Sequence, residues 1–68
     1  MIININGESR DVPNNCNAQD LIELLEMQND KIAMEVNMEI VPRSTYADFT
    51  FNEGDKIEIV RAIGGGSL

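Results

Sequence analysis

The chain ends in three glycines, Gly64-Gly65-Gly66, followed by Ser67 and Leu68. Glycine has no Cβ, so its backbone fits a narrow channel and a carboxyl group on its Cα is open to attack. Such a run predicts a chain end that a partner threads into its own active site. The alternative is a terminus without a role, since chain ends that pack against nothing are common. Taken alone, the glycines favour the second interpretation.

The residue types that are missing exclude several kinds of site. The 68 residues contain no His and one Cys, which rules out a Ser-His-Asp or Cys-His catalytic unit, a Cys/His metal site and an internal disulfide. Cys16 precedes a predicted helix, whose N-terminus can lower a thiol pKa, but we interpret it as an ordinary small loop residue. Arg43 and Arg61 could bind an acidic partner, although a solvated charge is the simpler interpretation of each.

The net charge and the distribution of apolar residues limit the possible partners of the protein and its location in the cell. The net charge of −7 argues against nucleic acid, because binding phosphates requires Lys and Arg. No apolar run is long enough to span a membrane and no signal peptide is recognisable, so we expect a cytoplasmic protein. We also expect a monomer that the excess of acid keeps in solution, with neither a metal nor a bound cofactor.

Turn residues and apolar alternation predict the elements that must present the tail. Asn6-Gly7 is a strong hairpin signal, because both residues tolerate positive φ. A second turn is expected at Asn37-Met38. The predicted strands are residues 1–6, 8–12, 32–36, 39–41 and 56–63. Between the last two, residues 43–51 are expected to be irregular, with Tyr46, Phe49 and Phe51 as apolar plugs.

One amphipathic helix is predicted over residues 18–28. Asn17 is a good N-cap and Asp20 lies three residues later, where it can cap the same turn. At about 100° per residue the apolar positions fall on one stripe. They are Ala18, Leu21, Ile22, Leu24 and Leu25.

These elements predict an α+β domain over residues 1–63, followed by a flexible tail at 64–68. A mixed sheet of four or five strands with one helix packed across it buries every apolar face most simply. The last strand carries Ile57 and Ile59 on one face and Val60 and Ala62 on the other, which indicates a central strand.

The second half of the chain resembles a known family. The stretch 33–66 is similar to the small sulfur carriers of thiamine biosynthesis, the ThiS-like branch of the ubiquitin-like β-grasp proteins and of the wider ThiS and MoaD family. The resemblance rests on Val36-Asn37, on Ile40-Val41-Pro42-Arg43, on Gly54-Asp55, on Ile57-Glu58-Ile59-Val60 and on the glycine tail. The N-terminal strand and the start of the helix match more loosely.

The resemblance implies a β-grasp fold and a role as protein cosubstrate, not as enzyme. In this family an adenylating enzyme related to ubiquitin activators uses Mg-ATP to convert the C-terminal Gly carboxylate to an acyl-adenylate. Sulfur from a cysteine desulfurase persulfide then gives a thiocarboxylate, and thiazole synthase uses that sulfur to build the thiazole ring of thiamine. ATP is thus used by the partner.

The same resemblance implies which residues react. Gly66 would carry the thiocarboxylate, with Gly65 beside it, and Ile63 and Gly64 would complete the tail that partners bind. The chain departs from the family because Ser67-Leu68 follows Gly66, which leaves Gly66 without a free carboxylate. Our hypothesis is that a protease removes the two residues, as ubiquitin precursors are trimmed; the alternative is a remnant of cloning.

Other functions stay open at this point. A carrier of the same type could serve molybdopterin, methionine or cysteine biosynthesis, or tRNA thiolation, and the acceptor enzyme decides which. A ubiquitin-like modifier joined to lysines by an isopeptide bond is a different class. A third class is an interaction module whose tail is inert.

Overall fold

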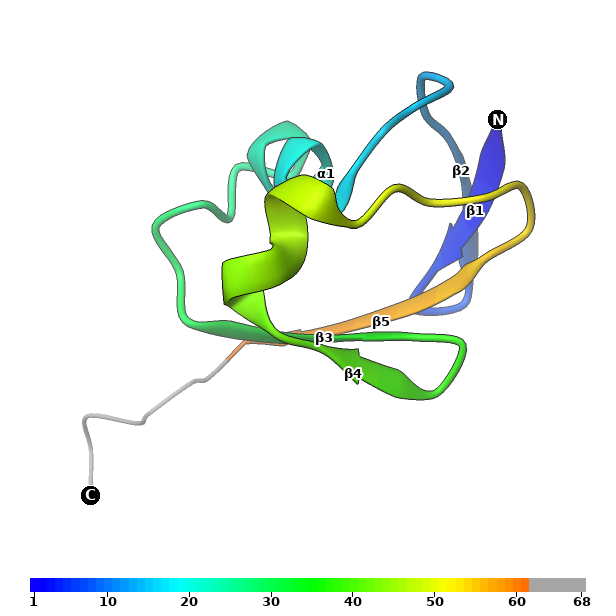
Figure 1. The fold of residues 1–68 in the computed structure, drawn as a ribbon. Helices are drawn as coiled ribbons and strands as arrows, with labels where there is room; N and C mark the ends of the chain where they lie inside the picture. The colour runs from blue at the N-terminus through cyan, green and yellow to red at the C-terminus, as the bar shows by residue number, and fades with distance from the viewer. Residues whose placement is uncertain (62–68) are drawn as a thin grey trace.

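The computed structural model describes residues 1–61, and the chain from residue 62 to residue 68 lies outside the described part (Figure 1). Five strands, one α-helix and one 3-10 helix make up the described fold. In chain order they are β1 (Ile2–Ile5), β2 (Glu8–Asp11), α1 (Ala18–Leu24), β3 (Ile32–Val36), β4 (Glu39–Val41), η1 (Arg43–Asp48) and β5 (Lys56–Arg61).

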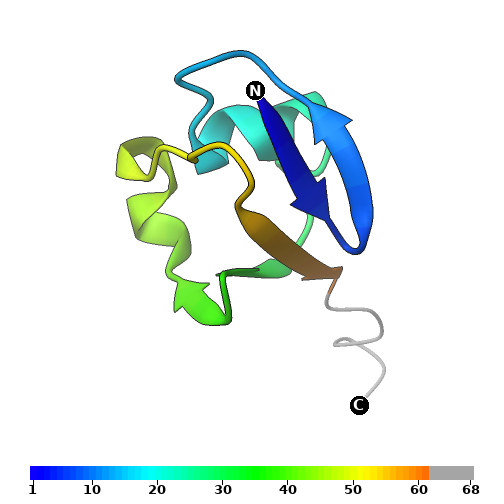
Figure 2. The ribbon, with the colours of Figure 1, turned by 90° about the vertical axis from the view of Figure 1, so that its right-hand side faces the viewer.

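The strands form one mixed sheet in the order β2-β1-β5-β3-β4. β1 and β5 are parallel, and all other neighbouring pairs are antiparallel. α1 and η1 both lie on one face of this sheet, while the other face is not covered by any described element (Figures 1 and 2). The predicted mixed sheet with one helix across it is confirmed, and β5 is its central strand.

β5 is central for a different reason from the one predicted. Ile57 and Ile59 are buried under the helices, as expected. Val60, on the opposite face, is 64% exposed, so its apolar side chain is not covered by a second layer. The strand is central because β1 and β3 pair with its two edges, not because both of its faces are buried.

Two tight turns follow the sequence prediction. Asn6 and Gly7 join β1 to β2 with φ values of 51° and 89°. Asn37 and Met38 join β3 to β4 with φ values of 51° and 72°. Both pairs lie in the left-handed region that Asn and Gly tolerate best. The first turn places the start of β1 beside the end of β2, with Ile2 opposite Asp11.

The start of α1 is capped as predicted. The Asp20 N–H donates to Asn17 Oδ1 at 2.7 Å, and the Asn17 N–H donates to Asp20 Oδ2 at 3.3 Å. These two bonds satisfy donors that the first turn of a helix leaves without partners. The Asn17 side chain also donates to the carbonyl of Ala47 at 3.2 Å, which ties the helix start to η1.

The end of α1 is where the helix prediction is wrong. The helix stops at Leu24 instead of Gln28, because Glu26 adopts a left-handed conformation with φ of 59°. The Met27 N–H then bonds back to the Ile22 carbonyl at 2.8 Å, the reversal that ends many helices. Leu24, predicted on the apolar stripe, is half exposed as a result.

Residues 43–48 form a 3-10 helix, where the sequence analysis expected irregular chain. The predicted plugs are largely confirmed, since Tyr46 and Phe51 are buried and Phe49 is partly buried against them. The core that they complete lies between the sheet and the two helices. Its buried members are Ile3, Val12, Cys16, Ala18, Leu21, Ile22, Met34, Val36, Val41, Tyr46, Phe51, Ile57 and Ile59.

Candidate functional site

The predicted reactive end of the chain lies outside the described residues. This applies to Ile63, Gly64, Gly65 and Gly66, and to the Ser67-Leu68 extension. The structure does describe the strand that leads to them, because β5 runs to Arg61. The candidate site is therefore built from the surroundings of the last residues of β5.

Two arginines hold the loop that leads from α1 to β3, next to the end of β5. The Arg61 guanidinium lies 3.0 Å from the Asp30 carboxylate. Arg43 donates to the main-chain carbonyls of Asp30 at 2.7 Å and of Gln28 at 2.6 Å. The Arg43 guanidinium also lies 5.9 Å from the centre of the Tyr46 ring. Arg43 is therefore more than the solvated charge that the sequence suggested, whereas Arg61 forms a partly exposed ion pair.

The uncovered face of the sheet presents apolar side chains beside the end of β5. Val60 lies opposite Ala33 of β3, and both are exposed. Ile40 of β4, which is 75% exposed, lies on the same face. A cavity of about 320 Å³ opens here, and Lys31, Ile32, Ala33, Arg43 and Val60 line it. This apolar surface with basic side chains at its border is suited to contact with a partner protein.

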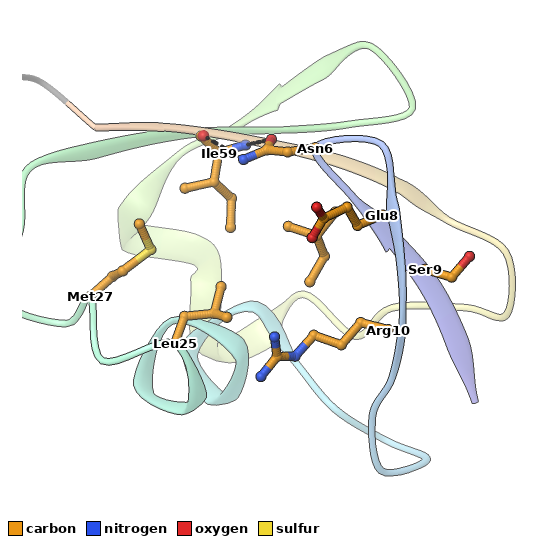
Figure 3. Close-up of a pocket in the computed structure, with 8 residues that line it drawn as sticks. Asn6, Glu8, Ser9, Arg10, Leu25, Met27 and Ile59 are labelled. Atoms are coloured by element: carbon orange, nitrogen blue, oxygen red, sulfur yellow. Dashed lines mark hydrogen bonds between the residues drawn. The ribbon is translucent and has the colours of Figure 1, made fainter.

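A larger groove lies on the helix side of β5. It has a volume of about 430 Å³ and is formed between the β1–β2 hairpin and the end of α1 (Figure 3). Arg10 reaches from β2 toward Leu25, while Ser9 points away from the hollow (Figure 3). The lining residues are Ile5, Asn6, Glu8, Ser9, Arg10, Leu25, Met27 and Ile59.

Cys16 does not have the environment of a reactive thiol. Its side chain is 4% exposed and belongs to the core. Burial raises the pKa of the Cys16 thiol, and the nearby negative charge of Asp20 raises it further. A raised pKa disfavours the thiolate, which is the nucleophilic form. The structure thus supports a packing role for Cys16 and speaks against a reactive thiol with a lowered pKa.

Residues 1–61 contain neither a metal-binding cluster nor a membrane-spanning helix. Within that part of the chain, no three Cys, Asp or Glu side chains are grouped so that they could hold a metal ion. None of the helices described there is long and apolar enough to cross a membrane.

Comparison with known proteins identifies the family. The sequence profile of the ThiS family matches residues 3–66. A thiazole synthase of Paramagnetospirillum magneticum is 48% identical over 63 residues, which are 93% of this chain and 19% of that protein. A thiazole synthase of Magnetococcus marinus is 36% identical over 66 residues, covering 97% of this chain and 20% of that protein. The chain thus spans about a fifth of these relatives.

The fold comparison agrees. The crystal structure of the thiamine biosynthesis protein ThiS from Geobacter metallireducens superposes with a TM-score of 0.82 and 28% sequence identity. The superposition covers 97% of this chain and all of that one. The predicted ubiquitin-like β-grasp fold is confirmed, as is the resemblance drawn from the sequence. The chain belongs to the ThiS family.

Proposed function

We propose that the protein is a sulfur carrier for thiamine biosynthesis and that Gly66 is its reactive residue once Ser67 and Leu68 have been removed. In this role it is a protein cosubstrate that acts in the cytoplasm as a monomer. It binds no cofactor of its own, and the ATP is used by an adenylating partner. Gly65, Gly64 and Ile63 form the arm that enters the partner's active site.

The observation that carries this proposal is the extent of the family match. The match runs through the three glycines and ends at Gly66, before Ser67 and Leu68. The same residue is the one that the chemistry requires as chain end. From Arg61, the last described residue, a chain reaches about 17 Å to Gly66 when fully extended. That length suits a slot in a partner's surface close to the end of β5.

The proposed chemistry explains why the carboxylate must be carried to another protein. A carboxylate oxygen of Gly66 attacks the α-phosphorus of ATP and pyrophosphate leaves, so the acyl carbon gains AMP as a leaving group. The terminal sulfur of a persulfide on a cysteine desulfurase or on an intermediate carrier then displaces AMP. A thiol cleaves the resulting acyl disulfide and releases the thiocarboxylate. Within residues 1–61 we find no group suited to these steps, and we assign them to the partners.

We propose thiazole synthase as the acceptor of the sulfur. Two proteins named thiazole synthase contain a segment similar to almost the whole chain. This supports a functional relation between a carrier of this type and the remainder of those proteins. The exposed apolar side chains Val60, Ala33 and Ile40 provide a surface beside the tail that a partner can cover. Covering it removes apolar area from water and so favours association.

The test uses two forms of the protein, one ending at Gly66 and one with all 68 residues. Each is incubated with the cognate adenylating enzyme, Mg-ATP, a cysteine desulfurase, cysteine and a reductant, and its intact mass is measured. The form ending at Gly66 should gain the mass difference between sulfur and oxygen. The 68-residue form should keep its mass, because its Gly66 has no free carboxylate.

A control form is tested in the same reaction, and the competing functions are tested in that reaction and in cell extract. A form ending at Gly65 moves the carboxylate one residue closer to the fold and should react much more slowly. Equal sulfur loading of the 68-residue form would refute the assignment of Gly66. Conjugates to other proteins in cell extract, without a thiocarboxylate, would indicate a ubiquitin-like modifier, and an unreactive trimmed form would indicate an interaction module.

A further inference from the structure

The last residues of β5 are held on one edge by a side chain instead of a strand. β1 is paired with β5 only as far as Ile57, because the chain turns away at Asn6. On the opposite edge β3 remains paired with β5 as far as Arg61. Without a substitute for β1, the main-chain groups on the edge of β5 that faces the hairpin would have no hydrogen-bond partners just before the tail.

Asn6 provides that substitute with its side-chain amide. The Ile59 N–H donates to Asn6 Oδ1 at 2.9 Å, and Asn6 Nδ2 donates to the Ile59 carbonyl at 3.2 Å (Figure 3). The Asn6 main-chain N–H donates to the Ile57 carbonyl at 2.9 Å. One residue therefore satisfies both main-chain groups of Ile59, as a further residue of β1 would do.

This contact is not a requirement of the turn in which Asn6 lies. The turn requires positive φ at residue 6, and glycine adopts that conformation more easily than asparagine. A glycine there would complete the hairpin and leave Ile59 without its two bonds. The amide group of Asn6 thus has a separate structural effect, and that effect falls on the strand that carries the tail.

We propose that Asn6 is a positioning residue for activation of the tail: its amide fixes the direction in which the chain leaves β5. This inference rests on the proposed function, since it assumes that Gly66, seven residues beyond Ile59 in the sequence, must enter a partner's active site.

The physical argument concerns conformational entropy. A strand end with hydrogen bonds on both edges is held more firmly than an end paired on one edge, which opens more readily. A partner that docks beside β5 would then have to order the frayed residues as well as the tail, which weakens binding. Because Asn6 touches no reacting atom, its loss should raise KM for the carrier more than it lowers kcat.

Asn37 offers a matched control at the other end of the same strand. It has the same φ of 51° in a turn, and its side-chain Oδ1 accepts from the Lys56 N–H at 3.1 Å. Its Nδ2 donates to the Asp55 carboxylate at 3.1 Å. Replacing it by glycine removes a similar amide contact with β5 at the end that is farthest from the tail.

The experiment compares Asn6→Gly, Asn6→Asp and Asn37→Gly with the wild type, all ending at Gly66. Hydrogen exchange of the Ile59 amide is measured by NMR, and adenylation is measured as ATP–pyrophosphate exchange catalysed by the cognate enzyme. Asn6→Gly should speed Ile59 exchange about tenfold, the effect of losing about one net hydrogen bond. Its KM should rise several-fold with little change in kcat.

Asn6→Asp keeps the shape of the side chain and the acceptor for the Ile59 N–H, but it places a carboxylate oxygen against the Ile59 carbonyl where the amide donated, so it should also raise KM. Asn37→Gly should leave both Ile59 exchange and KM unchanged. Faster Ile59 exchange in Asn6→Gly with a KM equal to that of Asn37→Gly would overturn the inference. Absence of adenylation in the wild type would instead refute the proposed function. Unchanged Ile59 exchange in Asn6→Gly would show that the bonds from Asn6 to Ile59 do not hold the strand, and would overturn the inference.

Discussion

Replacement of Arg43 by alanine should destabilise the protein by about 2.5 kcal/mol, because this one side chain connects η1 to the loop between α1 and β3. Its guanidinium donates to the carbonyls of Gln28 and Asp30 at 2.6 and 2.7 Å. Each bond at this exposed position should contribute about 1 kcal/mol. Contact with the Tyr46 ring adds about 0.5 kcal/mol.

The assay is urea unfolding at equilibrium, supported by thermal melting, where a loss of this size should lower the midpoint by about 10 °C in so small a domain. Arg43→Lys should recover part of the loss, because an ammonium group keeps the charge but cannot bond both carbonyls as a planar fork does. Arg10→Ala is the control, since the side chain of Arg10 makes no hydrogen bond or ion pair within the described residues and its loss should change stability by less than about 0.5 kcal/mol.

Salt should change the contributions of Arg43 and Arg61 to stability in different ways. The Arg43 bonds end on neutral carbonyls, so most of their contribution should persist in 1 M NaCl, where charges are screened within about 3 Å. The Arg61–Asp30 pair joins two partly exposed charges, and its small contribution should fall in the same solution. An Arg43→Ala protein that is no less stable than Arg10→Ala, or whose loss of stability disappears in 1 M NaCl, would show that the two carbonyl bonds do not hold the loop.

Three further predictions concern stability. Asn17→Ala should cost about 1–2 kcal/mol in urea unfolding because it removes the cap of α1, and Asn17→Asp should recover most of that loss. Glu26→Gly should stabilise by about 1 kcal/mol, since glycine adopts the positive φ at this position without steric cost; destabilisation would contradict the proposed reason for the early end of α1. The raised pKa of Cys16 means that the unfolded thiol ionises first, so the contribution of this thiol to stability should be constant below its ordinary pKa of 9.0 and should fall as the pH rises above it. Cys16→Ser should lose this part of the dependence, whereas Tyr46, whose pKa burial raises from its ordinary value of 10.0, should still lower stability at higher pH.

Much of the fold could be predicted from local sequence signals. The strands Ile32–Val36 and Glu39–Val41 are observed with the predicted bounds, because a turn that needs positive φ separates them and Pro42 ends the second. Asn17 and Asp20 predicted the start of the helix equally well, since capping depends on residues close together in the chain.

Two sequence predictions were wrong, each for a different physical reason. The end of α1 was missed because Glu26 takes a left-handed conformation that glycine usually signals. The 3-10 helix at Arg43–Asp48 was missed because such short helices have weak sequence patterns and depend on tertiary contacts, here between Tyr46 and the core.

The sequence was enough to predict the tail of the candidate site, but not the contacts around the end of β5 that precede it. The glycines and the family resemblance are visible in the sequence alone. The bonds of Asn6 to Ile59 and of Arg43 to the α1–β3 loop join segments far apart in the chain, so they depend on the register of the sheet and on packing. In the sequence, Asn6 indicated only a turn and Arg43 only a charge.

The role of Gly66 is tested most directly by the intact mass of the protein isolated from its native host under thiamine limitation. The isolated chain should end at Gly66, with part of the population heavier by the difference between sulfur and oxygen at the C-terminal carboxyl group. Fragmentation should place that difference on Gly66. A sulfur-loaded protein that still carries Ser67 and Leu68 would show that Gly66 is not the reactive residue.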